Sequence, residues 1–141
     1  MKLEKVLYTA HATSTGGREG TSKTDDGVLD VKLTTPKQLG GNGATGTNPE
    51  QLFAAGYSAC FIGAMKHVAA GMKVRLPADV ALDTEVDLCS GVDGYFLRAR
   101  LNASLPGLER QVAQSILDDA HQTCPYSKST RGNIEVEINL V

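Results

Sequence analysis

The chain has 141 residues, 41% of them hydrophobic, and its 14 Lys and Arg against 16 Asp and Glu give a formal charge of −2. This charge argues against nucleic acid or an anionic membrane as the main partner, and no apolar run reaches the roughly 18 residues of a bilayer span. The first residues do not form a secretion signal. We therefore expect one folded, cytoplasmic domain over residues 1–141.

Three short strands are predicted at the N-terminus. Apolar residues alternate weakly over residues 5–13 and clearly over residues 28–34, as in half-buried strands. The turn signals at residues 16–17 and 25–27 bound a further strand at residues 18–24. Together these elements predict a small antiparallel meander.

A long helix is predicted over residues 49–71. Asn48 can cap this helix, and Pro49 suits its first position. Residues 51–65 carry almost no charge, which indicates a helix that is buried on most sides. We expect it to pack against its copy in a second subunit; the alternative is a monomer with the helix clamped between two sheets.

The loop before this helix contains the spacing Gly-x-Gly-x-x-Gly at residues 41–46. A dinucleotide site needs a strand directly before the first glycine and an acidic residue about twenty positions later. The predicted strand ends well before the loop, and Lys66 stands at the later position. We therefore interpret residues 41–46 as a connecting loop.

The second half of the chain alternates again. Residues 80–88 and 97–103 predict a hairpin whose acidic and basic side chains face each other across the strands. A second helix is predicted from Pro106 and ends before Pro125, and residues 134–140 predict a final strand. The element order β-β-β-α-β-β-α-β indicates an α+β fold.

Three cysteines form an odd set, which excludes a disulfide scaffold. Cys60 lies in the apolar helix, where it is either an inert buried thiol or a nucleophile with a nearby cation. Arg18, just after the first turn, is one candidate cation, although it is equally consistent with a solvated surface residue. Cys124 precedes Pro125 at a helix end, where mobility would suit a resolving cysteine, and Cys89 is interpreted as incidental.

His121 and Cys124 have a His-x-x-Cys spacing that is only a weak metal signal, because structural zinc takes four ligands. A histidine in the last turn of a helix is a favourable residue there without any metal. We therefore expect no metal site.

Four segments carry a specific resemblance. They are Thr15-Gly16-Gly17-Arg18, the run from Thr47 to Phe61 that contains Cys60, His121-Gln122-Thr123-Cys124-Pro125-Tyr126-Ser127, and Thr130-Arg131-Gly132-Asn133-Ile134. With the element order, they make the whole chain resemble the organic hydroperoxide resistance proteins of the OsmC-like superfamily.

The resemblance implies the OsmC-like fold in an intertwined homodimer whose central apolar helices pack between sheets. It also implies a thiol peroxidase that reduces organic hydroperoxides, is itself reduced by a dithiol such as protein-bound dihydrolipoamide, and needs no metal or organic cofactor. By motif, Cys60 is the peroxidatic cysteine, Cys124 the resolving cysteine, and Arg18 and Glu50 are their polar partners.

Elementary physics constrains this assignment. Only a thiolate attacks peroxide, and burial without a cation would raise the pKa of Cys60, so Arg18 must lie close and Glu50 can hold its guanidinium. Glu50 and Cys60 are separated by about 15 Å in one straight helix. We therefore expect either a helix broken at Gly56 or a site that takes Glu50 from the partner subunit, and we favour the partner.

Aromatic and sulfur-containing neighbours of Cys60 predict an apolar cleft that would favour alkyl or lipid hydroperoxides over hydrogen peroxide. The same residues are also consistent with an ordinary core. Two other functions remain open at this point: a protein that binds an apolar ligand without turnover, and a thiol redox sensor. The candidate substrate-binding residues are Phe53, Tyr57, Phe61, Met65 and Tyr126.

Overall fold

The computed structural model describes residues 1–141, which form two compact units, Met1–Pro49 and Glu50–Val141. Each unit is considered by itself. None of the helices has the length and apolar character needed to cross a bilayer.

The first unit is the predicted antiparallel meander. Strand β1 (Ala12–Thr15), the 3₁₀ turn η1 (Gly17–Glu19), β2 (Thr21–Thr24) and β3 (Asp30–Lys32) form a sheet in the order β1-β2-β3, followed by a second 3₁₀ turn, η2 (Lys37–Leu39). Gly27 has a φ of 72° in the turn between β2 and β3, a conformation that glycine adopts without strain.

The first predicted strand is wrong over most of its length. We expect a strand over residues 5–13, but β1 begins only at Ala12 and pairs with β2 over Ala12–Thr15. An alternating pattern becomes a strand only where a neighbouring strand accepts its backbone hydrogen bonds, and β2 ends at Thr24. Residues 1–11 belong to no strand, and their large apolar side chains are exposed.

The second unit contains helix α1 (Pro49–Gly71), the strands β4 (Ala81–Gly91) and β5 (Gly94–Ser104), helices α2 (Arg110–Thr123) and α3 (Pro125–Thr130), and strand β6 (Val136–Leu140). Its sheet has the order β4-β5-β6, with β4 antiparallel and β6 parallel to β5. The predicted bounds of α1 and the predicted hairpin are confirmed. The helix α3 is an addition to the predicted element order.

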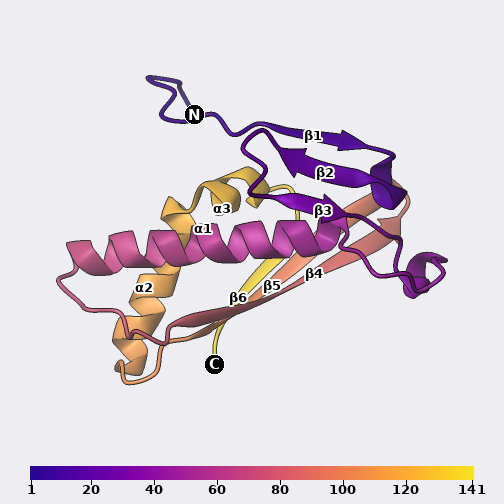
Figure 1. The fold of residues 1–141 in the computed structure, drawn as a ribbon. Coiled ribbons are helices and arrows are strands. Elements are labelled where there is room, and N and C mark those ends of the chain that lie inside the picture. The colour runs from indigo at the N-terminus through magenta and orange to yellow at the C-terminus, as the bar shows by residue number, and fades with distance from the viewer. The chain divides into compact units, whose positions relative to one another are not determined.

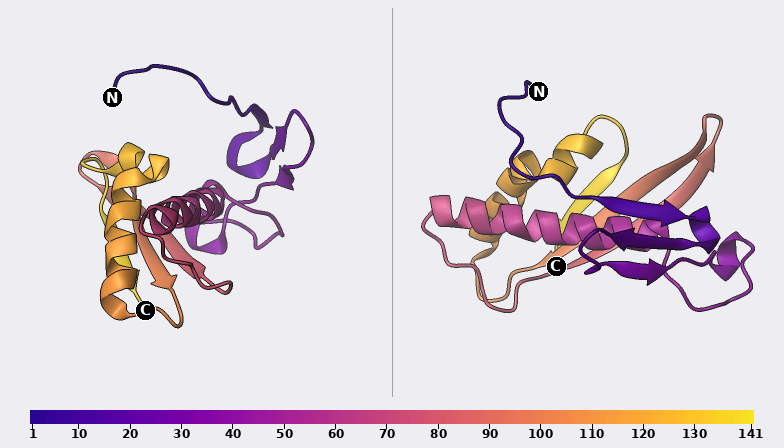
Figure 2. Two further views of the ribbon diagram at one scale, coloured as in Figure 1. Left: turned by 90° about the vertical axis from the view of Figure 1, so that its left-hand side faces the viewer. Right: turned by 45° about the horizontal axis from the view of Figure 1, so that its top comes forward.

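The core of this unit lies between one face of the sheet and the two long helices, as Figure 1 shows. In the left view of Figure 2, α1 is seen nearly end-on with α2 beside it. Inward-facing Ala99, Leu101 and Ala103 of β5 are wholly buried against them. The small alanines let the helices approach the sheet closely, and α1 contributes the largest side chains. The wholly buried large residues of the two helices are Tyr57, Phe61, Met65, Ile116 and Leu117.

The opposite face of the β4–β5 hairpin carries the predicted charge pairs. The Arg100 guanidinium donates two hydrogen bonds to Asp87, at 2.7 and 2.9 Å, and a third to Glu85 at 3.2 Å. Arg98 donates to Asp87 at 2.9 Å. Hydrogen bonds from Arg100 and Arg98 hold the pKa of Asp87 well below its usual range. These pairs fit the register of the hairpin, in which Glu85 lies opposite Arg100 and Asp87 lies opposite Arg98.

Candidate active site

The two cysteines singled out by the sequence meet inside the second unit. Cys60 lies in the middle of α1, and Cys124 lies at the junction of α2 and α3. The Cys124 thiol donates a weak hydrogen bond to the Cys60 sulfur, with the two sulfurs 3.5 Å apart. Because a disulfide bond measures about 2.05 Å, an approach of about 1.5 Å would join them.

The two thiols differ in access. Cys124 is wholly buried, whereas Cys60 is partly accessible. The backbone holds Cys124 on both sides, because its N–H donates to the Ala120 carbonyl at 2.8 Å and its carbonyl accepts from Lys128 at 2.9 Å. Cys124 is therefore anchored between two helices in this structure, rather than placed at a loose end.

The surroundings of Cys60 within this unit act mainly against ionisation. Burial raises the pKa of the Cys60 thiol, and negative charge on the adjacent Cys124 sulfur raises it further. The main-chain N–H of Tyr126 acts in the opposite sense, since its hydrogen bond favours the thiolate. This N–H lies in the first turn of α3, where backbone donors have no partner within the helix.

An aromatic cluster adjoins the two cysteines. The Tyr126 ring lies 5.9 Å from the Phe53 ring and 5.6 Å from the Tyr57 ring, measured between centroids. The Tyr126 hydroxyl packs over Gly56, where an added Cβ would come within 2.6 Å of it, so a larger residue there would displace the Tyr126 ring. The cluster also reaches Phe61, whose ring is 6.4 Å from that of Tyr57.

The five predicted substrate-binding residues fall into a wholly buried group and an accessible group. Tyr57, Phe61 and Met65 are wholly buried and belong to the core, which agrees with the alternative interpretation of these residues as ordinary core residues. Phe53 is half-buried and Tyr126 is 36% exposed, so these two can meet a molecule that enters from solvent.

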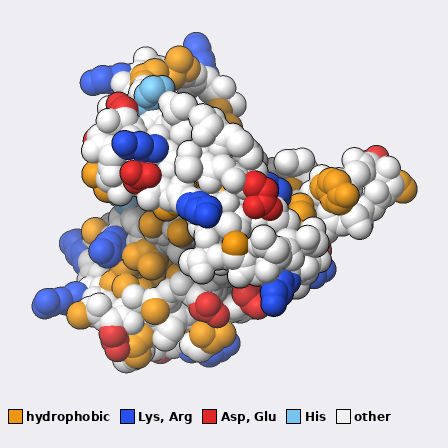
Figure 3. All heavy atoms as spheres, turned by 45° about the vertical axis from the view of Figure 1, so that its right-hand side comes forward, with side chains coloured by type: hydrophobic (Ala, Val, Ile, Leu, Met, Phe, Trp, Pro, Cys, Tyr) orange, Lys and Arg blue, Asp and Glu red, His pale blue; other side chains and the backbone are white.

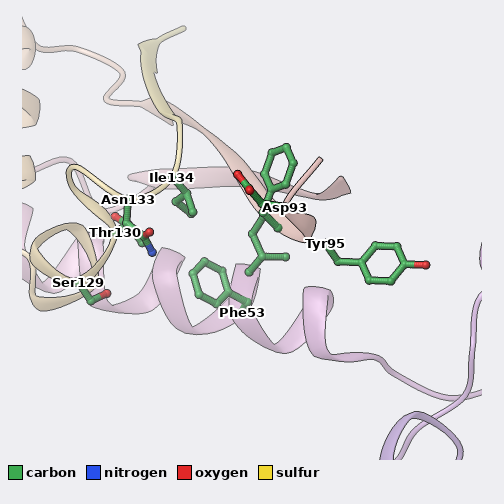
Figure 4. A pocket seen from close by; sticks show the side chains of 9 residues that line it. Phe53, Asp93, Tyr95, Ser129, Thr130, Asn133 and Ile134 are labelled. Carbon is green, nitrogen blue, oxygen red and sulfur yellow. The ribbon is translucent and has the colours of Figure 1, made fainter. Parts of the chain in front are cut away.

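Phe53 also forms one wall of an open pocket of about 690 Å³. Figure 4 shows the Phe53 side chain on α1 with Thr130, Asn133 and Ile134 across from it, while Tyr95 points away from the others. Phe53 is the one member of the aromatic cluster that lines this pocket, which extends to the hairpin tip and to the segment after α3, and neither cysteine lines it. The remaining lining residues are Asp93, Phe96, Leu97 and Ser129.

A buried hydrogen-bond network, which the sequence analysis missed, joins the three helices behind the cysteines. The Ser127 hydroxyl is wholly buried and lies 2.8 Å from the Tyr57 hydroxyl and 2.9 Å from Nδ1 of His121. Burial and the nearby Arg131 guanidinium lower the pKa of His121, which therefore remains neutral at pH 7. The only sequence signal was the place of His121 and Ser127 in the motif around Cys124.

The two predicted polar partners lie in different units. Arg18 is in η1 of the first unit, and Glu50 is in the first turn of α1 at the start of the second. Helix α1 runs without interruption through Gly56, which contradicts the less favoured alternative of a helix broken at that residue. At Gly56 the absence of a side chain leaves room for the close approach of Tyr126, and the helix has no kink there.

The sequence as a whole matches known proteins. A family model described as "OsmC-like protein" matches residues 40–139. A protein of Xanthomonas axonopodis pv. citri named organic hydroperoxide resistance protein is 56% identical over 137 residues, covering 97% of this chain and 96% of that protein. Organic hydroperoxide resistance protein OhrB of Bacillus subtilis is 42% identical and covers 96% of this chain and 98% of its own.

Solved structures agree with this assignment and confirm the predicted α+β fold class. The crystal structure of OhrB from Bacillus subtilis has a TM-score of 0.89 at 43% identity, covering 96% of this chain and 100% of that chain. An organic hydroperoxide resistance protein from Legionella pneumophila has a TM-score of 0.91 at 44% identity, covering 96% and 98%. The chain therefore belongs to the OsmC-like protein family, and within it to the organic hydroperoxide resistance proteins.

Proposed function

We propose that this protein is a cytoplasmic thiol peroxidase that detoxifies organic hydroperoxides by reducing them to alcohols. The observation that carries the proposal is the pair of reduced sulfurs, Cys60 and Cys124, held 3.5 Å apart on different helices. Two thiols at this distance can store the two electrons that a peroxide takes up. The names of the relatives support organic hydroperoxides as the substrate class.

The difference in solvent access supports the proposed roles of the two thiols. A peroxide from solvent can reach the partly accessible Cys60 but not the wholly buried Cys124. The Cys60 thiolate attacks the terminal peroxide oxygen and the O–O bond breaks, giving Cys60 sulfenic acid and an alkoxide that takes a proton to become the alcohol. The Cys124 sulfur then attacks the Cys60 sulfur, and the thiol proton leaves with the hydroxyl as water. The product is a Cys60–Cys124 disulfide.

A cation must oppose the burial of Cys60. Because burial raises the pKa of the Cys60 thiol, a guanidinium at the sulfur is needed to keep it ionised near pH 7. We assign this role to Arg18, with Glu50 holding the guanidinium fork by charge-assisted hydrogen bonds. Arg18 also stabilises the negative charge that develops on the departing alkoxide.

The aromatic cluster and its pocket favour an apolar substrate. Phe53 and Tyr126 are the accessible members of the cluster, and the 690 Å³ pocket beside Phe53 has room for an alkyl chain. We propose direct substrate contact for Phe53 and Tyr126, with Tyr57, Phe61 and Met65 packed behind them.

Stoichiometric oxidation tests the function. One equivalent of cumene hydroperoxide should remove two thiols from the reduced protein and form the Cys60–Cys124 disulfide, detected by mass spectrometry of the peptides. Dihydrolipoamide should then restore both thiols and sustain turnover, with a larger kcat/KM for cumene hydroperoxide than for hydrogen peroxide. A ligand-binding protein would leave the hydroperoxide intact, and a redox sensor would form the disulfide without sustained turnover with the dithiol.

We further propose that the chain acts as a single domain of a homodimer. Helix α1 exposes the small residues Ala55, Ala59 and Gly63 along one side, and few charges accompany them. Hydrophobic side chains also reach the surface in groups on the face drawn in Figure 3. A second copy would cover such apolar surface. Exposed large apolar residues at the hairpin tip of the second unit are Val92, Tyr95 and Phe96.

The continuity of α1 makes a shared site the simplest arrangement. Ten residues of unbroken helix separate Glu50 from Cys60, which is about 15 Å of rise. One guanidinium that contacts the Cys60 sulfur cannot easily reach Glu50 of the same chain. We therefore propose that Glu50 of the partner subunit completes the site.

A mixed dimer tests this arrangement. Cys60→Ser and Glu50→Ala chains with different tags are co-expressed, and the mixed dimer is isolated by both tags. If the sites are shared, one site contains both intact residues, and the mixed dimer should show about half the wild-type rate. The Glu50→Ala homodimer should be slower than wild type by about tenfold or more. A mixed dimer no faster than half the Glu50→Ala homodimer would show that each site takes both residues from one chain.

A further inference from the structure

Four side chains form a continuous chain of hydrogen bonds behind the cysteines. Nδ1 of His121 lies 2.9 Å from the Ser127 hydroxyl, which lies 2.8 Å from the Tyr57 hydroxyl. The Tyr57 hydroxyl lies 3.3 Å from that of Thr130, which donates to the Ser127 carbonyl at 3.2 Å. Tyr57 and Ser127 are wholly buried, and Thr130 is 5% exposed.

The number of available protons fixes which group donates and which accepts in each of these hydrogen bonds. Each hydroxyl has a single proton to donate, and Thr130 donates its proton to the Ser127 carbonyl. Tyr57 must then donate to Thr130, Ser127 to Tyr57, and His121 to Ser127 through Nδ1–H. The four hydrogen bonds can form together only with this order of donors and acceptors. His121 therefore carries its proton on Nδ1.

This hydrogen-bond network includes residues that flank the resolving cysteine in the sequence. His121 precedes Cys124 by three residues on α2, and Ser127 follows it by three residues on α3. Tyr57 precedes Cys60 by three residues, which is about one turn of α1. The two hydrogen bonds of Ser127 therefore attach the backbone around Cys124 to the turn of α1 that presents Cys60.

We propose that Ser127, oriented by His121, is a positioning residue that holds the Cys124 sulfur within reach of the Cys60 sulfur and thereby sets the rate of disulfide formation. This inference rests on the proposed function. It concerns only the second step, in which Cys124 thiol and Cys60 sulfenic acid give a disulfide and water. The competing reaction takes a second hydroperoxide, which oxidises the sulfenic acid to sulfinic acid and leaves as the alcohol.

The competition between disulfide formation and sulfinic acid formation at Cys60 can be measured. Reduced protein without a dithiol is mixed with increasing cumene hydroperoxide, and the Cys60 peptide is quantified as disulfide or as sulfinic acid. In Ser127→Ala, a displacement of about 1 Å would slow disulfide formation by about ten- to hundredfold. The hydroperoxide concentration that gives half sulfinic acid should fall by the same factor, while the rate of the first oxidation of Cys60 stays at the wild-type value.

Matched variants distinguish a role of Ser127 in positioning Cys124 from a general loss of packing in the core. Ser58→Ala removes a half-buried hydroxyl of α1 that is outside this network and hydrogen-bonds to Thr84 of β4 at 2.7 Å, and this variant should partition as wild type. His121→Leu should resemble Ser127→Ala, whereas His121→Asn, whose side-chain N–H can take the place of Nδ1–H, should restore the wild-type partition. The His121 pair also decides the question if Ser127→Ala does not fold.

Two results would overturn the inference. Either Ser127→Ala and His121→Leu give half sulfinic acid at the wild-type concentration, or Ser58→Ala shifts that concentration as much as they do. In both cases the proposed function stands if wild-type protein still forms the Cys60–Cys124 disulfide. If hydroperoxide leaves wild-type Cys60 unoxidised, the proposed function itself is wrong.

Discussion

Cys60→Ser should lower hydroperoxide consumption to the uncatalysed rate, whereas Cys124→Ser should still reduce at least one equivalent of hydroperoxide per chain. The difference follows from the proposed roles of the two sulfurs, in which Cys60 attacks the peroxide and Cys124 forms the disulfide. Only a thiolate at position 60 can attack the peroxide, because a serine hydroxyl stays protonated near neutral pH. Without Cys124, the first step remains, but the sulfenic acid has lost the thiol that lies 3.5 Å away in the wild-type protein.

Rapid-mixing measurements of hydroperoxide loss, with mass spectra of the Cys60 peptide, would separate these cases. Cys124→Ser should accumulate sulfenic acid and then sulfinic acid at Cys60. The matched control is Cys89→Ser, since Cys89 lies on β4 opposite Phe96 and has no part in the proposed chemistry. Equal losses in the first turnover for Cys60→Ser and Cys124→Ser would contradict the assignment of roles.

Arg18→Ala should slow the attack on hydroperoxide by about 10²- to 10⁴-fold at pH 7. At least about thirtyfold comes from ionisation, because even an unperturbed thiol, with a pKa of about 8.5, is only about 3% thiolate at pH 7. The remainder comes from the alkoxide, which loses a donor as its charge develops. Burial keeps the pKa of Cys60 raised once the guanidinium is gone, so the rate of the variant should increase about tenfold per pH unit from pH 6 to 8.

The pH dependence of iodoacetamide labelling at the Cys60 peptide measures this ionisation directly. Wild-type protein should label at a nearly constant rate over pH 6 to 8, because its thiolate is already formed. Arg75→Ala removes an exposed arginine of the second unit and serves as the control for net charge. If Arg18→Ala and wild type share one labelling profile, Arg18 does not stabilise the thiolate, and the electrostatic part of the mechanism is wrong.

Local sequence signals made the second unit largely predictable. The capping residues Asn48 and Pro49 and the lack of charge place α1 at its observed bounds. The alternating acidic and basic residues of the hairpin form the expected pairs between Arg100, Asp87 and Glu85. These features depend on contacts between near neighbours in the chain or across one turn. The helix α3 was missed because Pro125 ends one helix and also begins the next, at the position where proline needs no hydrogen bond.

The N-terminal strand shows where such patterns stop being sufficient. Residues 5–13 alternate, yet only the last two of them join β1. Strand pairing is decided by which backbone lies alongside, and that depends on residues elsewhere in the fold.

For the site, the sequence alone determined the residue types: an apolar helix that carries Cys60, a second cysteine before a proline, and an arginine and a glutamate in specific motifs. Only the tertiary structure decided that Cys124 is buried against Cys60, although 64 residues separate them, and that Ser127 joins His121 to Tyr57. The physical reason is that periodicity reports which face of an element is apolar, whereas a distance between two side chains depends on how separate elements pack together.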